Sequence, residues 1–313
     1  MLLKNLTDVN NRVIRYTYKE EITMNENKVN INWYPGHMAK TLREIKQDMK
    51  LIDIVLVILD ARIPFSSLNK DVYEIIKSKT VIMVFNKADL ANITALNNAE
   101  AKYKKEGCYT VRTNSVTGEG IDKLISLIRE IGKKIKYENK TSKSYNALKP
   151  VYRALVVGVP NVGKSSLINK MSGKKSAEVG NKPGVTKKKQ WLKVGQDIEI
   201  MDTPGLLSKN LKEEGTGEKL AIAATIKEEI LDLEALAYHL INILMSNDWY
   251  EAMFKERYKL DSDINSMVEF EILDEIGRKR GALLKGDIVD TNKAAKILLE
   301  DYRSGKIGKI SLE

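Results

Sequence analysis

The stretch GVPNVGKSS, Gly158–Ser166, follows the apolar run YRALVVGV and precedes SSLINKM, which has helical character. It matches the pattern G-x-x-x-x-G-K-[ST], in which glycines let successive backbone N–H groups point at phosphate oxygens. The helix that follows adds the positive end of its dipole. We therefore predict a phosphate-binding loop in which Lys164 binds the β- and γ-phosphates and assists catalysis, and Ser165 binds Mg²⁺. The remaining predicted contacts of this loop are Asn161, Val162, Gly163 and Ser166.

The motif DTPG, Asp202–Gly205, ends the strand-like run DIEIMD. An aspartate at the carboxyl end of a strand beside a phosphate loop can hold the Mg²⁺ shell, and the N–H of Gly205 can meet a γ-phosphate. Between the two motifs lies NKPGVTKKKQ, where Thr186 is the candidate for a second Mg²⁺ hydroxyl with a catalytic role. This segment would be ordered only by the triphosphate. The alternative for Thr186 is an ordinary surface threonine.

The tetrapeptide NKAD, Asn86–Asp89, closes the apolar run TVIMVF. The Asp89 carboxylate can accept hydrogen bonds from the N1–H and exocyclic amine of guanine, a pattern that adenine does not offer. Asn86 would hold the loop, and Lys87 would lay its alkyl stem over the base. A second base loop, TNSVTGEG, follows the next strand-like run and offers Ser115 and the N–H of Val116 to the guanine carbonyl. These motifs predict binding of GTP and GDP.

The guanine motif precedes the phosphate loop, the reverse of the usual order, which indicates a circularly permuted GTPase domain. Because a parallel sheet tolerates new termini when the old ones are close, the site survives such a permutation. Strand-like and helical runs alternate, which predicts an α/β fold with a mostly parallel sheet and one antiparallel edge strand. The six predicted strands are 52–60, 80–86, 108–115, 152–159, 190–194 and 197–203.

The predicted domain organisation has three parts. Residues 1–30 are polar and are expected to form a flexible leader, the alternative being an upstream start codon with Met24 as the true start. Residues 31–208 form the GTPase domain, and residues 209–313 form an all-helical domain. The polar stretch 137–150 is the connector that joins the original termini. Five helical runs are expected in the last part, with Gly215, Gly217, Gly281, Gly286 and Gly305 as breaks.

The composition of the 313-residue chain restricts its partners. A net charge of +10 and a pI near 9.3 favour a polyanionic partner, nucleic acid before all else, although solubility alone is the alternative. The apolar runs are far shorter than the roughly 20 residues of a membrane span, so no membrane partner is expected. The single cysteine, Cys108, fits a reducing compartment and hence a cytoplasmic location. We expect an inert thiol there.

These motifs together resemble the circularly permuted ribosome-assembly GTPases of the YlqF/RbgA type. The resemblance runs from about residue 31 to the end and adds NWYPGHMAKT, DARIPFSS, KPGVTK and EIGRKRGALLKGDIVDTNKAA to the motifs above. It implies a GTP-hydrolysing assembly factor for the large (50S) ribosomal subunit, with a C-terminal helical domain that contacts rRNA. Because the segment after DTPG leads straight into that domain, we predict that binding to pre-ribosomal particles depends on the nucleotide. We expect no DNA partner and a monomeric protein.

Three residues have roles that the sequence leaves open. No glutamine follows DTPG to orient water, and His37 in YPGHMAKT is the candidate catalytic residue, as the resemblance implies; bracing the adjoining helix is its alternative. Asn161 resembles the asparagine of K⁺-dependent GTPases, so K⁺ is expected near it. Asp60, with Arg62, lies at the carboxyl end of a strand, where it can serve the site or form a structural ion pair.

Two other functions compete with an assembly GTPase. The first is a nucleotide-gated RNA-binding module in which GTP hydrolysis is incidental. The second is a P-loop ATPase or kinase unrelated to RNA, against which Asp89 argues.

Overall fold

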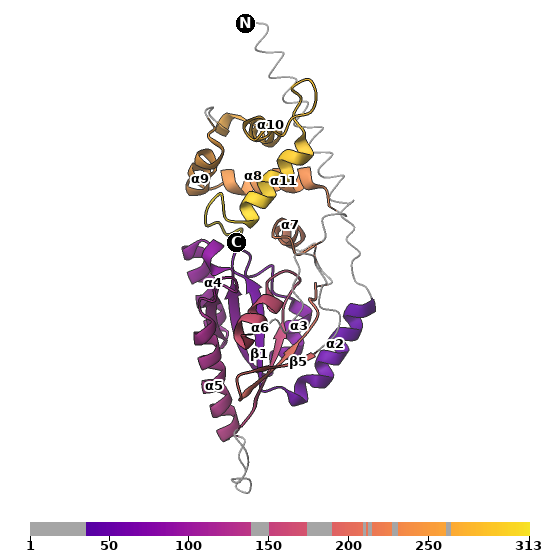
Figure 1. Ribbon diagram of the computed structural model, residues 1–313, viewed down its shortest axis with the longest axis vertical. Helices are drawn as coiled ribbons and strands as arrows, with labels where there is room; N and C mark the ends of the chain where they lie inside the picture. The colour runs from indigo at the N-terminus through magenta and orange to yellow at the C-terminus, as the bar shows by residue number, and fades with distance from the viewer. Residues whose placement is uncertain are drawn as a thin grey trace. The chain divides into compact units, whose positions relative to one another are not determined.

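A six-stranded sheet with the order β3-β2-β1-β4-β6-β5 occupies the first two thirds of the computed structural model (Figure 1). Four of the neighbouring pairs are parallel, and β5 runs antiparallel to β6 at one edge. The strands are β1 (Ile54–Asp60), β2 (Thr80–Asn86), β3 (Tyr109–Thr113), β4 (Tyr152–Val157), β5 (Gln190–Val194) and β6 (Ile198–Asp202). The six predicted strands and the antiparallel edge are confirmed.

Burial along the strands follows their place in the sheet. Every residue of β1, which lies between β2 and β4, is buried, as expected of a central parallel strand covered on both faces. The edge strand β5 instead alternates between more and less exposed residues along most of its length. β-Branched and leucine side chains dominate the central strands because they pack well on a pleated surface between two helical layers.

Helices cover both faces of the sheet. They are α2 (Gly36–Asp48), α3 (Lys70–Ile76), α4 (Ile93–Lys105), α5 (Ile121–Glu138) and α6 (Lys164–Ser172), with 3₁₀ turns at Met49–Leu51 and Ala88–Leu90. Right-handed crossovers place α3 and α4 on one face, because β1, β2 and β3 follow one another in one direction across the sheet. They place α5 and α6, which contact each other, on the opposite face.

Helices also make up the rest of the chain. They are α7 (Thr216–Ile222), α8 (Leu233–Met245), α9 (Asp248–Tyr258), α10 (Glu269–Lys279) and α11 (Thr291–Arg303), with a 3₁₀ turn at Ile264–Ser266. Helix α8 packs against α11, α10, α7 and α9, so it is the centre of this group. The Asp232 side chain caps the first turn of α8 by accepting a hydrogen bond from the N–H of Ala235.

One expected helix break is wrong. Gly217 lies inside α7 and does not end a helix. A Cβ atom at this position would lie 3.0 Å from the carbonyl oxygen of Leu211, so the glycine allows close backbone approach. Helix α7 ends at Ile222, and two residues later Ala224 has a left-handed φ of 62°.

The structure describes residues 36–138, 150–173, 190–208, 211, 215–226, 231–260 and 264–313. The predicted leader 1–30 and most of the connector 137–150 lie outside these residues. Pro35–Glu313 form one compact unit. The boundary between 31–208 and 209–313 therefore stays a prediction.

Candidate functional site at the carboxyl edge of the sheet

Parallel strands bring the sequence motifs to one edge of the sheet. The phosphate loop follows β4 and DTPG follows β6, and these two strands are neighbours. NKAD follows β2, and the second base loop follows the adjacent β3. Strand β1 lies between the two pairs. All these segments leave from the carboxyl ends of their strands, which is where ligands bind in open α/β sheets.

The side chain of Asn86 joins the base motif to the phosphate loop. It is fully buried, and its Nδ2 donates to the carbonyl oxygen of Val162 at 2.7 Å and to Ser115 Oγ at 3.1 Å. Its Oδ1 accepts from Ser115 N at 3.1 Å and from Thr113 Oγ1 at 3.2 Å. One amide therefore ties three loops from separate parts of the chain. The sequence predicted that Asn86 holds its own loop, and the contact with Val162 is the added finding.

The phosphate loop itself is closely packed. Lys164 is buried, and its Nζ donates to the carbonyl oxygens of Gly158 at 3.1 Å and Val159 at 2.9 Å. Burial lowers the pKa of Lys164 to about 8, although the carboxylate of Asp202 opposes this shift. Gly163, with φ of 95°, precedes α6, and a Cβ atom there would lie 2.3 Å from Asn86 Nδ2. Only glycine allows this approach of the loop to Asn86.

The first turn of α6 and the neighbouring loop hold the other predicted phosphate contacts. Ser165 and Ser166 directly follow Lys164 in this turn. Val162 is fully buried, and Asn161 has a positive φ of 58°. The Nδ2 of Asn161 donates to the carbonyl oxygen of Ala224 at 2.7 Å, so the loop contacts the end of α7.

Asp202 and Gly205 lie beside the phosphate loop. Asp202 is fully buried, and neither of its carboxylate oxygens has a hydrogen-bond partner of normal geometry among the described residues. Burial raises the pKa of Asp202, and the ammonium of Lys164 opposes that shift. A Cβ atom on Gly205 would lie 2.8 Å from the backbone of Pro160, so DTPG packs directly on the phosphate loop. The Lys164 ammonium and the Gln190 side chain offset only part of the cost of burying this carboxylate, so the position favours a bound cation.

The base motif is held by a buried group of charges. Lys87 has a left-handed φ of 59°, and its Nζ lies 2.8 Å from Asp60 Oδ2. Asp60 is fully buried and also pairs with Arg62 at 2.7 Å. Burial alone would raise the pKa of Asp60, but the cations of Arg62 and Lys87 together lower it. Asp60 is therefore both an ion-pair partner of Arg62 and a support for Lys87. Its position at the end of the strand next to the NKAD strand is the signal that could have found the second role.

The other predicted base contacts lie at the same edge. Asp89 is exposed in the 3₁₀ turn Ala88–Leu90, where it can meet a ligand from solvent. Ser115 is buried against Asn86, as described above. The N–H of Val116 already donates to Asn114 Oδ1 at 2.8 Å. A guanine carbonyl would have to share or replace this bond, and the role of Val116 stays a prediction.

The residues predicted to activate water lie partly outside the described part of the chain. His37 is the second residue of α2, and its side chain is outside the described residues, as is all of Thr186. Leu206 and Leu207, which follow DTPG, are only 3% and 1% exposed. Buried leucines cannot orient water, which agrees with the expectation from the sequence.

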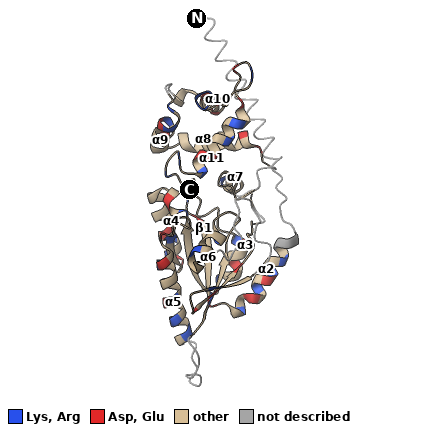
Figure 2. Ribbon diagram, viewed as in Figure 1, with Lys and Arg blue, Asp and Glu red and all other residues tan. Residues whose placement is uncertain are grey.

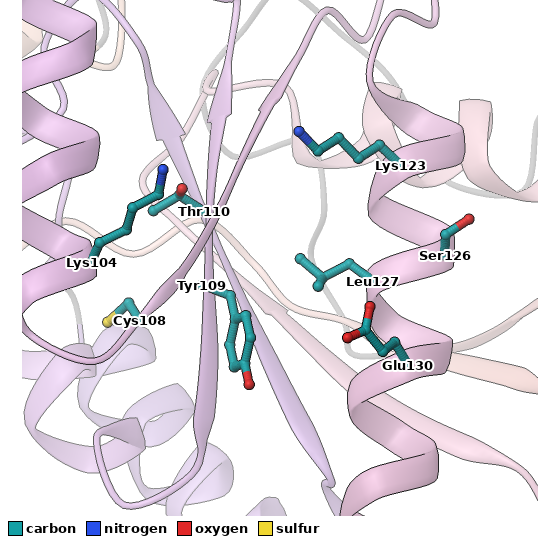
Figure 3. A pocket seen from close by; sticks show the side chains of 8 residues that line it. All are labelled: Lys104, Cys108, Tyr109, Thr110, Lys123, Ser126, Leu127 and Glu130. Atoms are coloured by element: carbon teal, nitrogen blue, oxygen red, sulfur yellow. The ribbon is translucent and has the colours of Figure 1, made fainter.

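A cavity away from this edge has a different character. It has a volume of about 360 Å³ and lies between α4, β3 and α5. Figure 3 shows Lys104 on the α4 side, Cys108–Thr110 along the strand, and Lys123, Ser126, Leu127 and Glu130 on the α5 side. These strand residues lie at the amino end of β3, opposite the motifs. Burial raises the pKa of the Cys108 thiol, and its Sγ lies 3.6 Å from the hydroxyl of Tyr73, so it fits the expected inert thiol.

The described part of the chain offers neither a cluster of metal ligands nor a membrane-spanning helix. Within it, no group of three or more His, Cys, Asp or Glu side chains is arranged to hold a metal ion. None of its helices combines the length and apolar character that crossing a bilayer requires. Figure 2 shows Lys and Arg mixed with Asp and Glu on the helices, so the positive charge is not confined to one element.

The fold and its converging motifs define a P-loop GTPase whose motif order is circularly permuted. A family model described as "50S ribosome-binding GTPase" matches residues 153–272. "Ribosome biogenesis GTPase A" of Bacillus pumilus is 40% identical over 284 residues, which cover 90% of this chain and 98% of the relative. The protein of the same name from Thermotoga maritima is 30% identical, over 90% of this chain and 94% of the relative.

Solved structures agree with these sequence relatives. The GDP-bound structure of TM YlqF matches with a TM-score of 0.61 and 27% identity, over 87% of this chain and 98% of that chain. The GNP-bound structure of YlqF from T. maritima matches with a TM-score of 0.58 and 27% identity, over 88% and 97%. The chain belongs to the ribosome biogenesis GTPase A family. It is a GTP hydrolase that binds guanine nucleotides.

Proposed function

We propose that this protein is a GTP-hydrolysing assembly factor for the large (50S) ribosomal subunit, and that it binds pre-ribosomal particles and rRNA in a nucleotide-dependent way. The observation that carries the proposal is the bond from Asn86 to Val162, because it unites the base and phosphate motifs in one site. The net charge of +10 supports a partner rich in phosphate. The relatives' names support a role in ribosome assembly.

We assign the base of one guanine nucleotide to the loops after β2 and β3, and its phosphates to the loops after β4 and β6. Asp89 reads the base, with Lys87 stacked on it and Asn86, Ser115 and Val116 around it. The phosphates lie against Lys164 and the N–H groups of the loop at the start of α6. The contacts assigned to this second group are Asn161, Val162, Gly163, Ser165, Ser166 and Gly205.

Mg²⁺ fits the residues beside the phosphate loop. The buried carboxylate of Asp202 lacks a hydrogen-bond partner of normal geometry among the described residues, and it lies beside Lys164. Ser165 and Asp202 would hold the ion, together with the hydroxyl of Thr186. Mg²⁺ would neutralise charge on the β- and γ-phosphates. K⁺ near Asn161 is the corresponding proposal for a monovalent ion.

Hydrolysis requires the water to be oriented and the developing charge to be stabilised. Lys164 supplies positive charge at the γ-phosphate, and Thr186 completes the site in the triphosphate state. His37 is the proposed group for the water, because Leu206 and Leu207 are buried and apolar. In the variant His37→Ala we expect unchanged GTP affinity and a collapse of ribosome-stimulated hydrolysis. A normal stimulated rate would remove His37 from the mechanism.

The segment after DTPG connects the γ-phosphate end of the site to the helices. The N–H of Leu206 donates to the carbonyl oxygen of Gly158 at 3.3 Å, and Asn161 contacts Ala224 at the end of α7. The first contact links the residue after DTPG to the phosphate loop, and the second links the phosphate loop to the end of α7. A movement of DTPG with nucleotide state would therefore reach α7 through the phosphate loop. This supports the proposal that GTP sets residues 209–313 for docking on rRNA and that hydrolysis releases them.

Co-sedimentation with large ribosomal subunits tests the function. We expect binding with a non-hydrolysable GTP analogue, much weaker binding with GDP, and a steep loss of both as salt increases. GTP turnover should rise when the subunits are added. Equal binding in the two nucleotide states would contradict the switch, and turnover without stimulation would favour the module with incidental hydrolysis. Size-exclusion chromatography of the purified protein tests the expected monomer. Fractionation of cells tests the expected cytoplasmic location.

A further inference from the structure

The segment Ile310–Glu313, here called the strap, contacts the loop that contains Asp89. The N–H of Ile310 donates to the carbonyl oxygen of Leu90 at 3.1 Å. The hydroxyl of Ser311 accepts the N–H of Asn92 at 3.1 Å. Leu90 directly follows Asp89, the residue predicted to recognise guanine. The strap therefore binds the backbone of the base loop immediately after Asp89.

The strap also contacts the loop that follows β1. The N–H of Leu312 donates to the carbonyl oxygen of Arg62 at 2.9 Å. The carboxylate of Glu313 accepts the N–H of Phe65 at 2.7 Å, the N–H of Ser66 at 3.0 Å, and the Ser66 hydroxyl. This loop carries Arg62, the partner of Asp60, and Asp60 in turn holds Lys87. The strap therefore supports the base motif directly and through its neighbour.

Helices hold the strap in place from the other side. The Tyr250 hydroxyl on α9 donates to the carbonyl oxygen of Ser311 at 3.2 Å, and Lys219 of α7 lies 3.7 Å from the Glu313 carboxylate. Ile310, Ser311 and Leu312 are all buried. Figure 1 shows the carboxyl end of the chain between the sheet and helices α7–α11. The strap is thus packed structure rather than a loose end.

The base loop needs such external support. Asp89 lies in a single 3₁₀ turn of three residues, and this turn follows Lys87 in a left-handed conformation that costs a non-glycine residue free energy. Such a conformation persists only where surrounding contacts determine it. The hydrogen bonds from Ile310 and Ser311 are contacts of this kind, because they fix the backbone at Leu90 and Asn92.

We propose that the strap is a positioning element for guanine recognition, which holds the Ala88–Asn92 loop so that the Asp89 carboxylate meets the base. The inference rests on the proposed role of Asp89 as the guanine reader. None of the strap contacts given above reaches the phosphate loop. Loss of the strap should therefore affect discrimination between bases more than the hydrolysis step.

The test compares GDP with inosine diphosphate, which lacks the exocyclic amine that Asp89 would read. We expect the unshortened chain to bind GDP about tenfold or more tightly than inosine diphosphate. In a chain shortened to end at Lys309, the ratio of the GDP affinity to the inosine diphosphate affinity should fall by about fivefold or more. GDP should dissociate faster, and the KM for GTP should rise. The kcat at saturating GTP should change by less than about twofold. A ratio equal to that of the unshortened chain, or equal weakening of the binding of both nucleotides, would overturn the proposal.

The variant Asp89→Asn separates this inference from the function on which it rests. If Asp89→Asn leaves the ratio unchanged, the assigned reader is wrong. If Asp89→Asn abolishes the preference and shortening does not, only the strap proposal fails. Should the shortened chain unfold, Ser311→Ala removes only the hydroxyl that accepts the Asn92 N–H, and it should lower the ratio partially. The matched control is Ser304→Ala, because the Ser304 hydroxyl donates only to backbone carbonyl oxygens near the end of α11, and the ratio of this variant should equal that of the unshortened chain.

Discussion

Asn86 Nδ2 donates a hydrogen bond to the carbonyl oxygen of Val162 at 2.7 Å, across 76 positions of sequence. Asn86 ends β2, and Val162 lies in the loop between β4 and α6. This bond explains why the reversed order of the motifs is harmless. A hydrogen bond depends on where two groups lie in space and not on which comes first in the chain, so the permuted domain keeps the connection between its base and phosphate loops.

Replacing Asn86 by alanine should weaken nucleotide binding and stability together. The change leaves the carbonyl oxygen of Val162 buried without its donor, which costs about 1–3 kcal/mol of the free energy of unfolding. We expect GTP and GDP affinity to fall about equally, measured by titration calorimetry alongside urea unfolding. The control is Asn98→Ala on the exposed side of α4, which should alter neither quantity. Unchanged affinity in Asn86→Ala would contradict its role at the junction.

The variants Gly163→Ala and Gly173→Ala separate backbone strain from steric conflict. Both glycines have positive φ, 95° and 65°, so each substitution costs about 1 kcal/mol in strain. The new Cβ at residue 163 would also lie 2.3 Å from Asn86 Nδ2, whereas nothing lies within 4 Å at residue 173. We expect Gly163→Ala to abolish measurable GDP binding and Gly173→Ala to keep it. Equal effects in a fluorescence binding assay would show that the close contact is not required.

Asp60 should make the protein sensitive to acid. Its folded pKa lies below the unfolded value of 3.8, so the unfolded chain binds more protons near that pH. The stability from Asp60 is therefore present above about pH 4 and is lost as the pH falls further. Asp60→Asn should cost about 3–5 kcal/mol at neutral pH, because it leaves Arg62 buried without its partner, and should flatten the loss in acid.

Urea unfolding between pH 3 and pH 7 measures this difference. The control Asp122→Asn, in the exposed first turn of α5, should lower stability by no more than about 1 kcal/mol and keep the acid profile of the natural chain. An Asp60→Asn protein with the same acid profile as the natural chain would contradict the prediction.

A glutamine placed after DTPG should not restore water activation. Leu207 is 1% exposed, so a glutamine there would bury an amide, at a cost of about 1–3 kcal/mol. We expect Leu207→Gln to lower stability with no gain in the GTP turnover of the isolated protein. Leu207→Met keeps the apolar volume and should cost less than about 1.5 kcal/mol. Faster turnover in Leu207→Gln would mean that this side chain can reach the nucleotide.

Local patterns predicted most of the fold. The limits of β2 and β5 coincide with the predicted runs, because stretches of apolar and β-branched residues are a local property of the sequence. The phosphate loop, NKAD and DTPG were likewise found as short motifs. Gly217 was misassigned because a glycine that permits close packing looks, in sequence, the same as one that ends a helix. The two roles of Asp60 could not be separated, since its contact with Lys87 is known only from the pairing of β1 with β2.

The amino-acid order alone determined which chemistry the chain carries, because a phosphate loop and a guanine motif consist of consecutive residues whose backbone and side chains act together. Only the tertiary structure decided how these pieces support one another. The bond from Asn86 to Val162 and the bonds from the strap to Leu90 and Asn92 join residues from distant parts of the chain. Contacts of this kind arise from the packing of strands and helices, and that packing leaves no periodic or local trace in the sequence.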